Sequence, residues 1–232
     1  MNRRELKRRV HRMLTQTSYD EFSLALAAYD PKPLINTLFP FLCSIDEIVR
    51  WRCVTAMGIV TAGLADSDLE EARVIMRRYL WMLNDESGGI GWGVPEVMAE
   101  SIYHSDQLAR EYLHMLVSYT LDDGPESFQD GNFLELPRLQ RGVLWGILRI
   151  APRYKEILFS MGIGERLGCY LSSSDNHVRG LAITLCGLLR LTSYQAVIEA
   201  FLDTTTQFDL FHEGEIFNLS IGAAAEEALS AF

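Results

Sequence analysis

One short pattern returns four times along the chain. The segments VRWRCVTAMG, IGWGVPEVMA, QRGVLWGILR and VRGLAITLCG begin at residues 49, 90, 140 and 178. Their second residues are separated by 41, 50 and 38 positions, and these are Arg50, Gly91, Arg141 and Arg179. Each segment begins a helical stretch, and another helical stretch with a polar turn precedes it. A lone helical hairpin cannot bury its apolar face, so we expect the units to stack around a continuous core. A fifth, weaker unit covers 218–231.

The apolar periodicity is helical from the first residues onward. The apolar side chains of the first helix form one stripe, with arginines on the other face, and they are Leu6, Val10, Met13 and Leu14. Further helices are expected over 19–29, from 34 to a break at Pro40, and over 48–62 behind a capping box at 44–47. Another helix follows the capping residues 66–68. No period-two pattern with hairpin turns is found, so we predict an all-α protein.

The turns between the helices carry a second repeated feature. Asp46 lies four residues before Arg50, and Asp175 lies four residues before Arg179. An Asp turn, a V-R opening to the second helix and a period near 40 together resemble HEAT-like repeats, which have an armadillo-type fold. The match in rhythm covers 33–232, and it is detailed only over 46–58 and 175–187. The unit at 84–100 lacks the Arg, and the third unit has Pro137 at the Asp position.

This resemblance implies a right-handed α-α superhelix, a HEAT-like solenoid of about five helical hairpins, and it points to bacterial HEAT-like proteins. We expect one domain over 1–232, with basic capping helices at 1–30 and repeats over 33–232. An insertion at 122–137 accounts for the long spacing of 50 residues. In such folds the second helices line the concave side, which is the usual binding surface.

The charge of the chain is unevenly distributed. The formal net charge is −10, but residues 1–12 carry six basic side chains against Glu5 alone. Without that segment the remainder carries about −15. An acidic body argues against wrapping a nucleic-acid backbone, because phosphate binding needs a basic surface. The basic helix itself either caps the fold against the acidic body, which we favour, or docks on a membrane surface, a nucleic acid or an acidic partner.

The N-terminal segment has no apolar stretch suited to secretion, and no uninterrupted apolar run reaches about 18 residues. We therefore expect no transmembrane segment and a cytoplasmic location. The four cysteines form no CxxC pair and are expected to be buried free thiols. The histidines show no zinc spacing. No catalytic residue, metal ligand or cofactor site is predicted.

The stretch NDESGGIGWGVPE, residues 84–96, contains four glycines and invites comparison with phosphate loops. It has no lysine, no preceding strand and a negative local charge, so a nucleotide site is not expected. The glycines and Pro95 fit an inter-helix joint instead. Trp92 aligns with Trp51 and remains a candidate binding residue. Glu96 and Glu100 lie one turn apart, as a carboxylate pair or, more commonly, as solvated helix charges.

The arginines at 50, 141 and 179 share one repeat position. The resemblance implies a structural ladder in which such arginines bond the Asp turns at Asp46 and Asp175. The other hypothesis is an exposed column on the concave face that binds a ligand. The binding candidates of that face are Arg50, Trp51, Trp92, Glu96, Glu100, Arg141, Trp145 and Arg179.

Two functions follow as hypotheses. The first is a non-enzymatic interaction module that binds another protein or peptide on the concave face. The alternative is an enzyme acting on nucleic acid that resembles HEAT-like alkylpurine DNA glycosylases, which place tryptophans and an Asp in a basic groove. The chain has tryptophans at 51, 81, 92 and 145 and an aspartate at 85. Exposed arginines and tryptophans favour the enzyme, whereas arginines buried against acidic turns favour the module.

Overall fold

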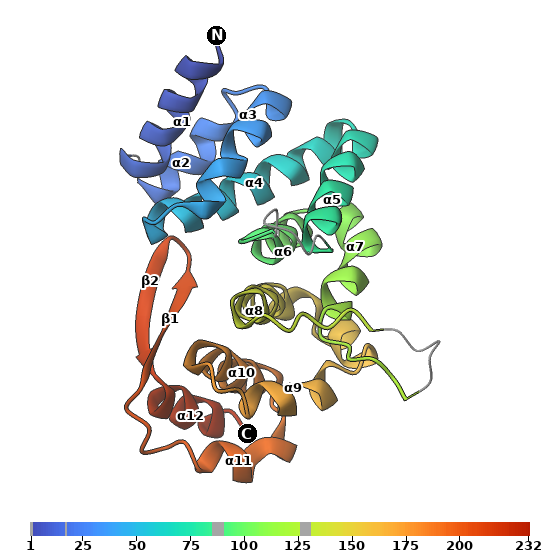
Figure 1. The fold of residues 1–232 in the computed structure, drawn as a ribbon, viewed down its shortest axis with the longest axis vertical. Coiled ribbons are helices and arrows are strands. Elements are labelled where there is room, and N and C mark those ends of the chain that lie inside the picture. Colours follow the sequence, from blue (N-terminus) through green and yellow to red (C-terminus); the bar gives the residue numbers. More distant parts are fainter. Residues whose placement is uncertain (1, 17, 85–90, 126–130) are drawn as a thin grey trace. The chain divides into compact units, whose positions relative to one another are not determined.

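The computed structural model describes residues 2–16, 18–84, 91–125 and 131–232 (Figure 1). The chain forms two compact units, Met1–Leu113 with Phe211–Glu215, and His114–Leu210 with Ile216–Phe232. The first contains α1 (Arg3–Gln16), α2 (Tyr19–Leu26), α3 (Pro31–Leu38), the 3₁₀ helix η1 (Phe39–Cys43), α4 (Glu47–Ser67), α5 (Leu69–Leu83), α6 (Val94–His104) and most of α7 (Asp106–Ser118). The second contains α8 (Pro137–Ser160), α9 (Ile163–Leu171), α10 (Asn176–Leu189), η2 (Thr192–Tyr194), α11 (Gln195–Glu199) and α12 (Ile221–Ser230). The single-domain organisation remains a prediction.

Helix α4 is the centre of the first unit. It packs against α6 most extensively, and also against α1, α3 and α5. The helix begins where the Asp46 carboxylate accepts a hydrogen bond from the Val49 N–H at 3.1 Å. The N-cap is therefore Asp46, and the predicted capping box at Ser44 is wrong. At the other end Asp68 caps α5 by accepting from the Glu71 N–H at 3.3 Å, as expected from the sequence.

The expectation of no membrane-spanning segment is not confirmed, because α4 is long and apolar enough to qualify. Among the described residues α4 is the one helix that is both long enough and apolar enough to cross a membrane, with a mean hydropathy of 1.3 in its most apolar window. In the structure 72% of that window is buried within the protein. Neighbouring helices cover α4 on several sides, and this explains why its sequence is apolar nearly all round.

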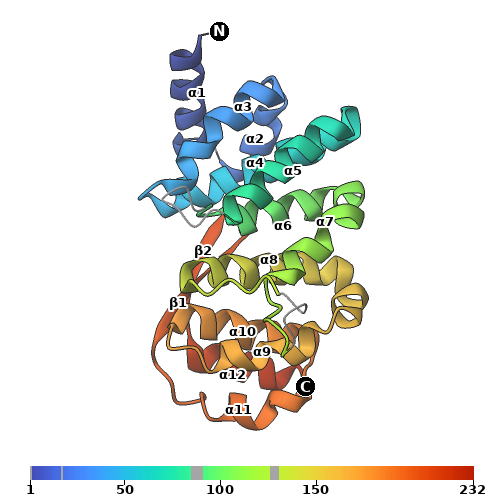
Figure 2. The same cartoon turned by 45° about the vertical axis from the view of Figure 1, so that its right-hand side comes forward.

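The second unit is built around α10 (Figure 2). This helix packs against α8, α9 and α12. Its apolar face is buried, and Gly187 allows close approach, since a Cβ there would lie 2.6 Å from the Cα of Ala228 in α12. Helix α8 contains Pro152 and departs from helical geometry at Tyr154, where φ is −125° and ψ is 24°. The four repeated segments lie at the beginnings of α4, α6, α8 and α10, which confirms the repeat rhythm.

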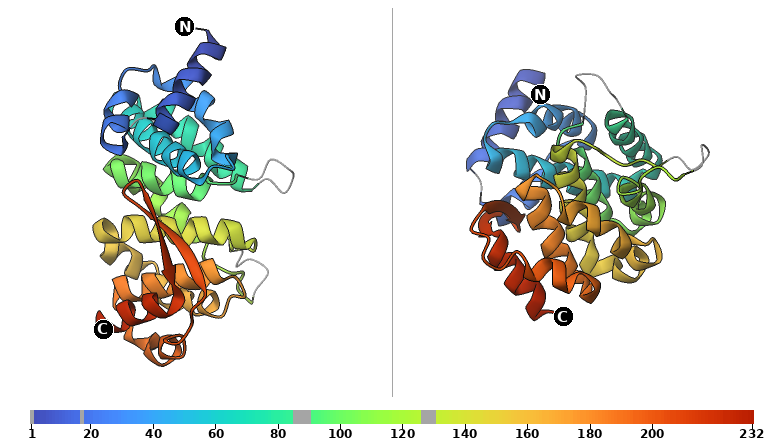
Figure 3. Two further views of the ribbon diagram at one scale, coloured as in Figure 1. Left: turned by 90° about the vertical axis from the view of Figure 1, so that its left-hand side faces the viewer. Right: turned by 60° about the horizontal axis from the view of Figure 1, so that its bottom comes forward.

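The prediction that strands are absent is wrong, because β1 (Gln207–His212) and β2 (Glu215–Ser220) form a two-stranded hairpin (Figure 3). Their two-residue turn places Glu213 at φ 45° and Gly214 at φ 91°, the signs required by a type I′ turn. Phe208 and Phe211 are the buried residues of β1. Since they are three positions apart, burial does not follow the alternation by which a strand is recognised. The fifth repeat is helical only from Ile221, after the Ser220 cap.

The first helix is confirmed as an amphipathic element. Its apolar stripe is buried, and its arginines are exposed. The carbonyl of Leu14 accepts a hydrogen bond from Arg52 of α4 at 3.1 Å, which ties the helix to the core of the first unit. The prediction for the cysteines is right in part. All four are free thiols, but only Cys53 and Cys186 are buried, whereas Cys43 and Cys169 are exposed.

Candidate functional site

The clearest rung of the predicted arginine ladder joins α8 to α10. The Nε of Arg141 donates to Asp175 Oδ1 at 3.0 Å, and its Nη2 donates to Oδ2 of the same carboxylate. Asp175 Oδ1 also accepts from the Val178 N–H at 3.0 Å, so it caps α10. Burial acts to raise the pKa of Asp175, but the hydrogen bonds from Arg141 and Val178 prevail and lower it. Asp175 therefore bonds the arginine of the preceding repeat.

Arg50 is held in a different way. Its side chain is only 15% exposed, and its guanidinium lies 3.4 Å from Glu47 and 3.7 Å from Glu96. The Asp46 carbonyl accepts from the backbone N–H of Arg50, while its carboxylate caps the helix. The acidic partner on a neighbouring repeat is thus Glu96 of α6. The unit that lacks the repeat arginine supplies a carboxylate to the arginine of the unit before it.

The expectation of solvated charges on α6 is wrong. Glu96 is 5% exposed and Glu100 is 1% exposed. Glu100 Oε2 lies 3.2 Å from His104 Nε2, one turn further along the same helix. Burial follows from Gly58 in α4, because a Cβ at that position would lie 2.2 Å from the Cβ of Glu100. The missing side chain lets the two helix backbones approach and covers the glutamate.

The tryptophan candidates are buried to different degrees. Trp51 is 8% exposed and stacks on Phe211 of β1, with ring centroids 4.6 Å apart and planes inclined by 3°. Trp145 of α8 is 5% exposed. Trp92 is half-buried and is therefore the most exposed of the three tryptophan candidates. The sequence alignment of Trp51 with Trp92 reflects their common repeat position, but their surroundings differ.

The described end of the glycine-rich stretch forms a joint into α6. The Gly91 N–H donates to the Met82 carbonyl at 3.0 Å, and the Val94 N–H donates to the Gly91 carbonyl at 3.0 Å. Gly93 has φ 79° and serves as N-cap, with Pro95 in the first turn of the helix. Over residues 91–96 these features agree with the inter-helix joint predicted for 84–96. Residues 85–90, which carry Gly88 and Gly89, lie outside the described residues.

Arg179 and His177 lie at the start of α10. The guanidinium of Arg179 donates to Asn176 and lies 5.7 Å from the ring of Phe201. His177 Nε2 lies 2.5 Å from the Asp209 carbonyl in β1. Burial lowers the pKa of His177, and the hydrogen bond to Asp209 opposes that effect only in part. No local sequence pattern marks His177, because its partner Asp209 belongs to a strand that was not predicted.

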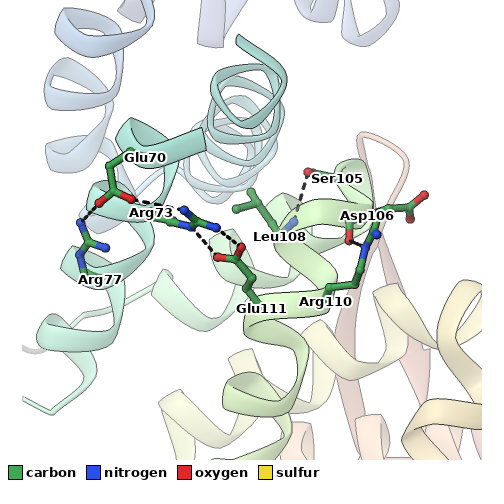
Figure 4. Close-up of polar contacts among 8 residues, drawn as sticks. All are labelled: Glu70, Arg73, Arg77, Ser105, Asp106, Leu108, Arg110 and Glu111. Atoms are coloured by element: carbon green, nitrogen blue, oxygen red, sulfur yellow. Dashed lines mark hydrogen bonds and ion pairs between the residues drawn. The ribbon is translucent and has the colours of Figure 1, made fainter. Parts of the chain in front are cut away.

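A further ion network has no local sequence signal, because it joins Arg73 to Glu111, 38 positions further along the chain. Arg73 of α5 donates from Nε and Nη2 to the two oxygens of Glu111 in α7, at 2.8 and 2.5 Å (Figure 4). Glu70 lies 3.4 Å from Arg73 and 2.7 Å from Arg77. The hydrogen bond from Arg77 lowers the pKa of Glu70. The hydrogen bond from Arg73 lowers the pKa of Glu111. Two arginines of α5 are therefore neutralised within the first unit.

The described ranges contain no group of three His, Cys, Asp or Glu side chains that is arranged to hold a metal ion. The absence of a cofactor stays a prediction. The arginines at the shared repeat position contact acidic or amide side chains. Arg50 contacts Glu47 and Glu96, Arg141 contacts Asp175, and Arg179 contacts Asn176. This arrangement orders helix ends and joins consecutive repeats.

Comparison with known proteins supports the same architecture. No protein-family model matches the chain, and no curated protein matches it. A designed armadillo repeat protein in complex with the peptide (KR)4 is 16% identical, with a TM-score of 0.55, and the match covers 97% of this chain and 91% of that one. An engineered protein, Northeast Structural Genomics Consortium target OR329, is 14% identical, with a TM-score of 0.53, and the match covers 100% and 96%. At these identities the likeness concerns the fold, and the chain has an armadillo/HEAT-like helical repeat fold.

Proposed function

We propose that this chain is a non-enzymatic scaffold that binds an extended segment of another protein on the concave face of its repeats. The observation that carries the proposal is the likeness, over 97% of the chain, to a designed armadillo repeat protein in complex with the peptide (KR)4. Stacked helical repeats present long, regular surfaces, and such surfaces suit extended peptides. A cytoplasmic location belongs to the same proposal.

The contacts at the repeat position support a scaffold over the alternative enzyme. A groove that acts on nucleic acid would use the arginines to neutralise phosphates. Arg141 is instead bonded to Asp175, and Arg50 lies between Glu47 and Glu96. Withdrawing either arginine toward a ligand would break its ion pair with the buried Glu96 or the half-buried Asp175, which is costly. The arginines are therefore better suited to ordering the repeats.

The net charge favours a basic segment as the occupant. The chain carries −10 overall and about −15 outside residues 1–12. A field of that sign attracts lysine- and arginine-rich segments and raises their association rate at low ionic strength. Trp92 is the candidate contact residue, because it is half-buried beside the α6 joint while Trp51 and Trp145 are buried.

The test is fluorescence anisotropy with labelled (KR)4, (DE)4 and (GS)4 peptides at two salt concentrations. We expect saturable binding of (KR)4 with one site per chain, weakened by salt, and no binding of (GS)4. Failure of (KR)4 to bind would contradict the basic occupant. A peptide-display selection against the whole chain tests the scaffold itself, and a selection that enriches no sequence would contradict it.

A pair of variants tests the contribution of Trp92. We expect Trp92→Ala to weaken (KR)4 binding about tenfold, because an aromatic anchor commonly contributes 1–2 kcal/mol or more. Trp81→Ala is the matched control, since Trp81 is 69% exposed on α5 and belongs to no proposed site. Equal affinities of the two variants, with melting temperatures like that of the unmodified protein, would remove Trp92 from the binding surface.

A further inference from the structure

A pocket of about 550 Å³ lies in the first unit among α1, α3 and α5. The described residues that line it are Arg3, Leu6, Pro33, Asn36, Thr37 and Arg78. Leu6 and Thr37 are buried and form the floor, whereas the other lining residues are exposed at the rim. The volume lies within the range of small-ligand sites. The pocket therefore combines a buried leucine and a buried threonine with the exposed side chains of two arginines.

Arg78 is held in place without a counter-charge. Its Nη1 donates to the Oδ1 of Asn36 at 2.9 Å, and its guanidinium lies 3.7 Å from the ring centroid of Phe39. Among the described residues no carboxylate pairs with it. Its neighbours on α5 differ, because Arg73 and Arg77 both bond glutamates (Figure 4). A fixed, unneutralised guanidinium is ready to accept a carboxylate in its planar fork.

Arg3 adds a second cation from a distant part of the sequence. It begins α1, where Glu5 pairs with Arg9 at 2.8 Å and so leaves Arg3 without that carboxylate. Lys32, which precedes the lining residue Pro33 in the sequence, is already bonded to Glu71 at 2.8 Å. Within the described ranges, Arg3 and Arg78 are the lining cations, and neither forms an ion pair. The basic segment 1–12 reinforces the positive potential at this mouth.

We infer that this pocket binds an acidic segment of a partner protein, with one carboxylate between Arg3 and Arg78 and an adjacent apolar side chain on Leu6 and Pro33. The apolar side chains of Leu6 and Pro33 favour a peptide over a bare phosphate backbone, which would offer nothing to cover them. The acidic remainder of the chain also opposes a long polyanion, which needs an extended basic surface. This site is distinct from the proposed scaffold surface, and its occupant has the opposite charge, so each proposal can fail alone.

The probe is a fluorescein-labelled (Glu-Leu)4 peptide, measured by anisotropy with the full chain. We expect saturable binding, and we expect Arg78→Gln and Arg3→Gln each to weaken it about tenfold. Arg8→Gln is the matched control, because it removes the same charge from the exposed face of α1 outside the pocket. Equal losses in Arg78→Gln and Arg8→Gln would show unspecific attraction to the basic segment and would overturn the site.

A third variant tests the geometry at Arg78 without removing an arginine. Asn36→Asp supplies an internal carboxylate to the guanidinium, so we expect it to weaken (Glu-Leu)4 binding while (KR)4 binding stays unchanged. Single-stranded RNA and phosphatidylserine vesicles complete the set of probes. If the RNA or the vesicles bind more tightly than (Glu-Leu)4, and if this binding is lost in Arg78→Gln but kept in Arg8→Gln, the occupant is not a peptide. Unchanged circular dichroism of the variants confirms that they fold.

Discussion

Asp175 bonds two elements at once: its carboxylate accepts from the Arg141 guanidinium of α8 and from the Val178 N–H in the first turn of α10. The first bond joins consecutive repeats, and the second starts a helix. Asp46 occupies the corresponding turn of the earlier repeat, and among the described residues its carboxylate makes only the second kind of bond, to Val49 at 3.1 Å. The two turns therefore allow the cap and the inter-repeat ion pair to be separated.

We expect Asp46→Ala to lower the free energy of unfolding by about 1 kcal/mol, the usual contribution of an N-cap. Asp175→Ala should cost about 1 kcal/mol more, because it also leaves Arg141 unpaired. The increment is modest because the Arg141 side chain is 41% exposed and its ion pair is screened by solvent. Denaturation in urea measures both changes. Equal costs would mean that the ion pair contributes nothing to stability.

Gly58 and Gly63 both lie on α4, but we expect their replacement by alanine to change the stability of the protein in opposite directions. Gly58→Ala places a Cβ 2.2 Å from the Cβ of Glu100, so we expect a loss of about 1–3 kcal/mol or more from overpacking. Nothing lies within 4 Å of the corresponding atom at Gly63. Gly63→Ala should therefore stabilise the helix by about 0.5–1 kcal/mol. Thermal unfolding measures both changes. A Gly58→Ala variant as stable as the unmodified protein would show that α4 and α6 are not in such close contact.

The stacked pair of Trp51 and Phe211 predicts an energetic coupling between α4 and β1. A double-mutant cycle with Trp51→Leu and Phe211→Leu should give about 0.5–1.5 kcal/mol, the usual excess for an aromatic pair. Amide exchange at β1 should also accelerate in Phe211→Leu. Strictly additive effects on stability, together with unchanged exchange, would show that the contact does not anchor the hairpin.

His177 predicts a loss of stability in mild acid. Burial lowers its pKa below the ordinary value of 6.5, with Arg141 lowering it further and Asp209 and Asp175 opposing the shift. Because the unfolded chain then binds more protons, stability is full above pH 6.5 and falls as the pH drops through the folded-state pKa. The lowered pKa of Asp175 acts below its ordinary value of 3.8, in a separate window.

The measurement is the melting temperature at pH 7.5 and 5.5 for the unmodified protein and for His177→Gln. We expect the variant to lose less stability on acidification, because it lacks the group that must be protonated against burial. The same pH dependence in both proteins would place the sensitive group elsewhere.

The helical repeats could be predicted because their signals are local. Caps such as Asp68 act within one turn, and the stripe from Leu6 to Leu14 follows the helical period. The hairpin could not be predicted in this way. Its turn, Glu213–Gly214, is less distinctive than Asn-Gly, and its buried positions follow the packing of Phe208 and Phe211 rather than strict alternation.

The candidate site shows the same division. The helical hairpins, their period and the turns where acidic and basic residues recur could be read from the sequence, because all of these depend on neighbours along the chain. The packing of helices in three dimensions was needed to show that Glu96 and Glu100 are buried and that Glu96 lies beside Arg50. It was also needed to show that Asn36 bonds Arg78 beside a pocket. Burial and pairing depend on which elements pack together, and a single absent Cβ at Gly58 changes how closely they approach.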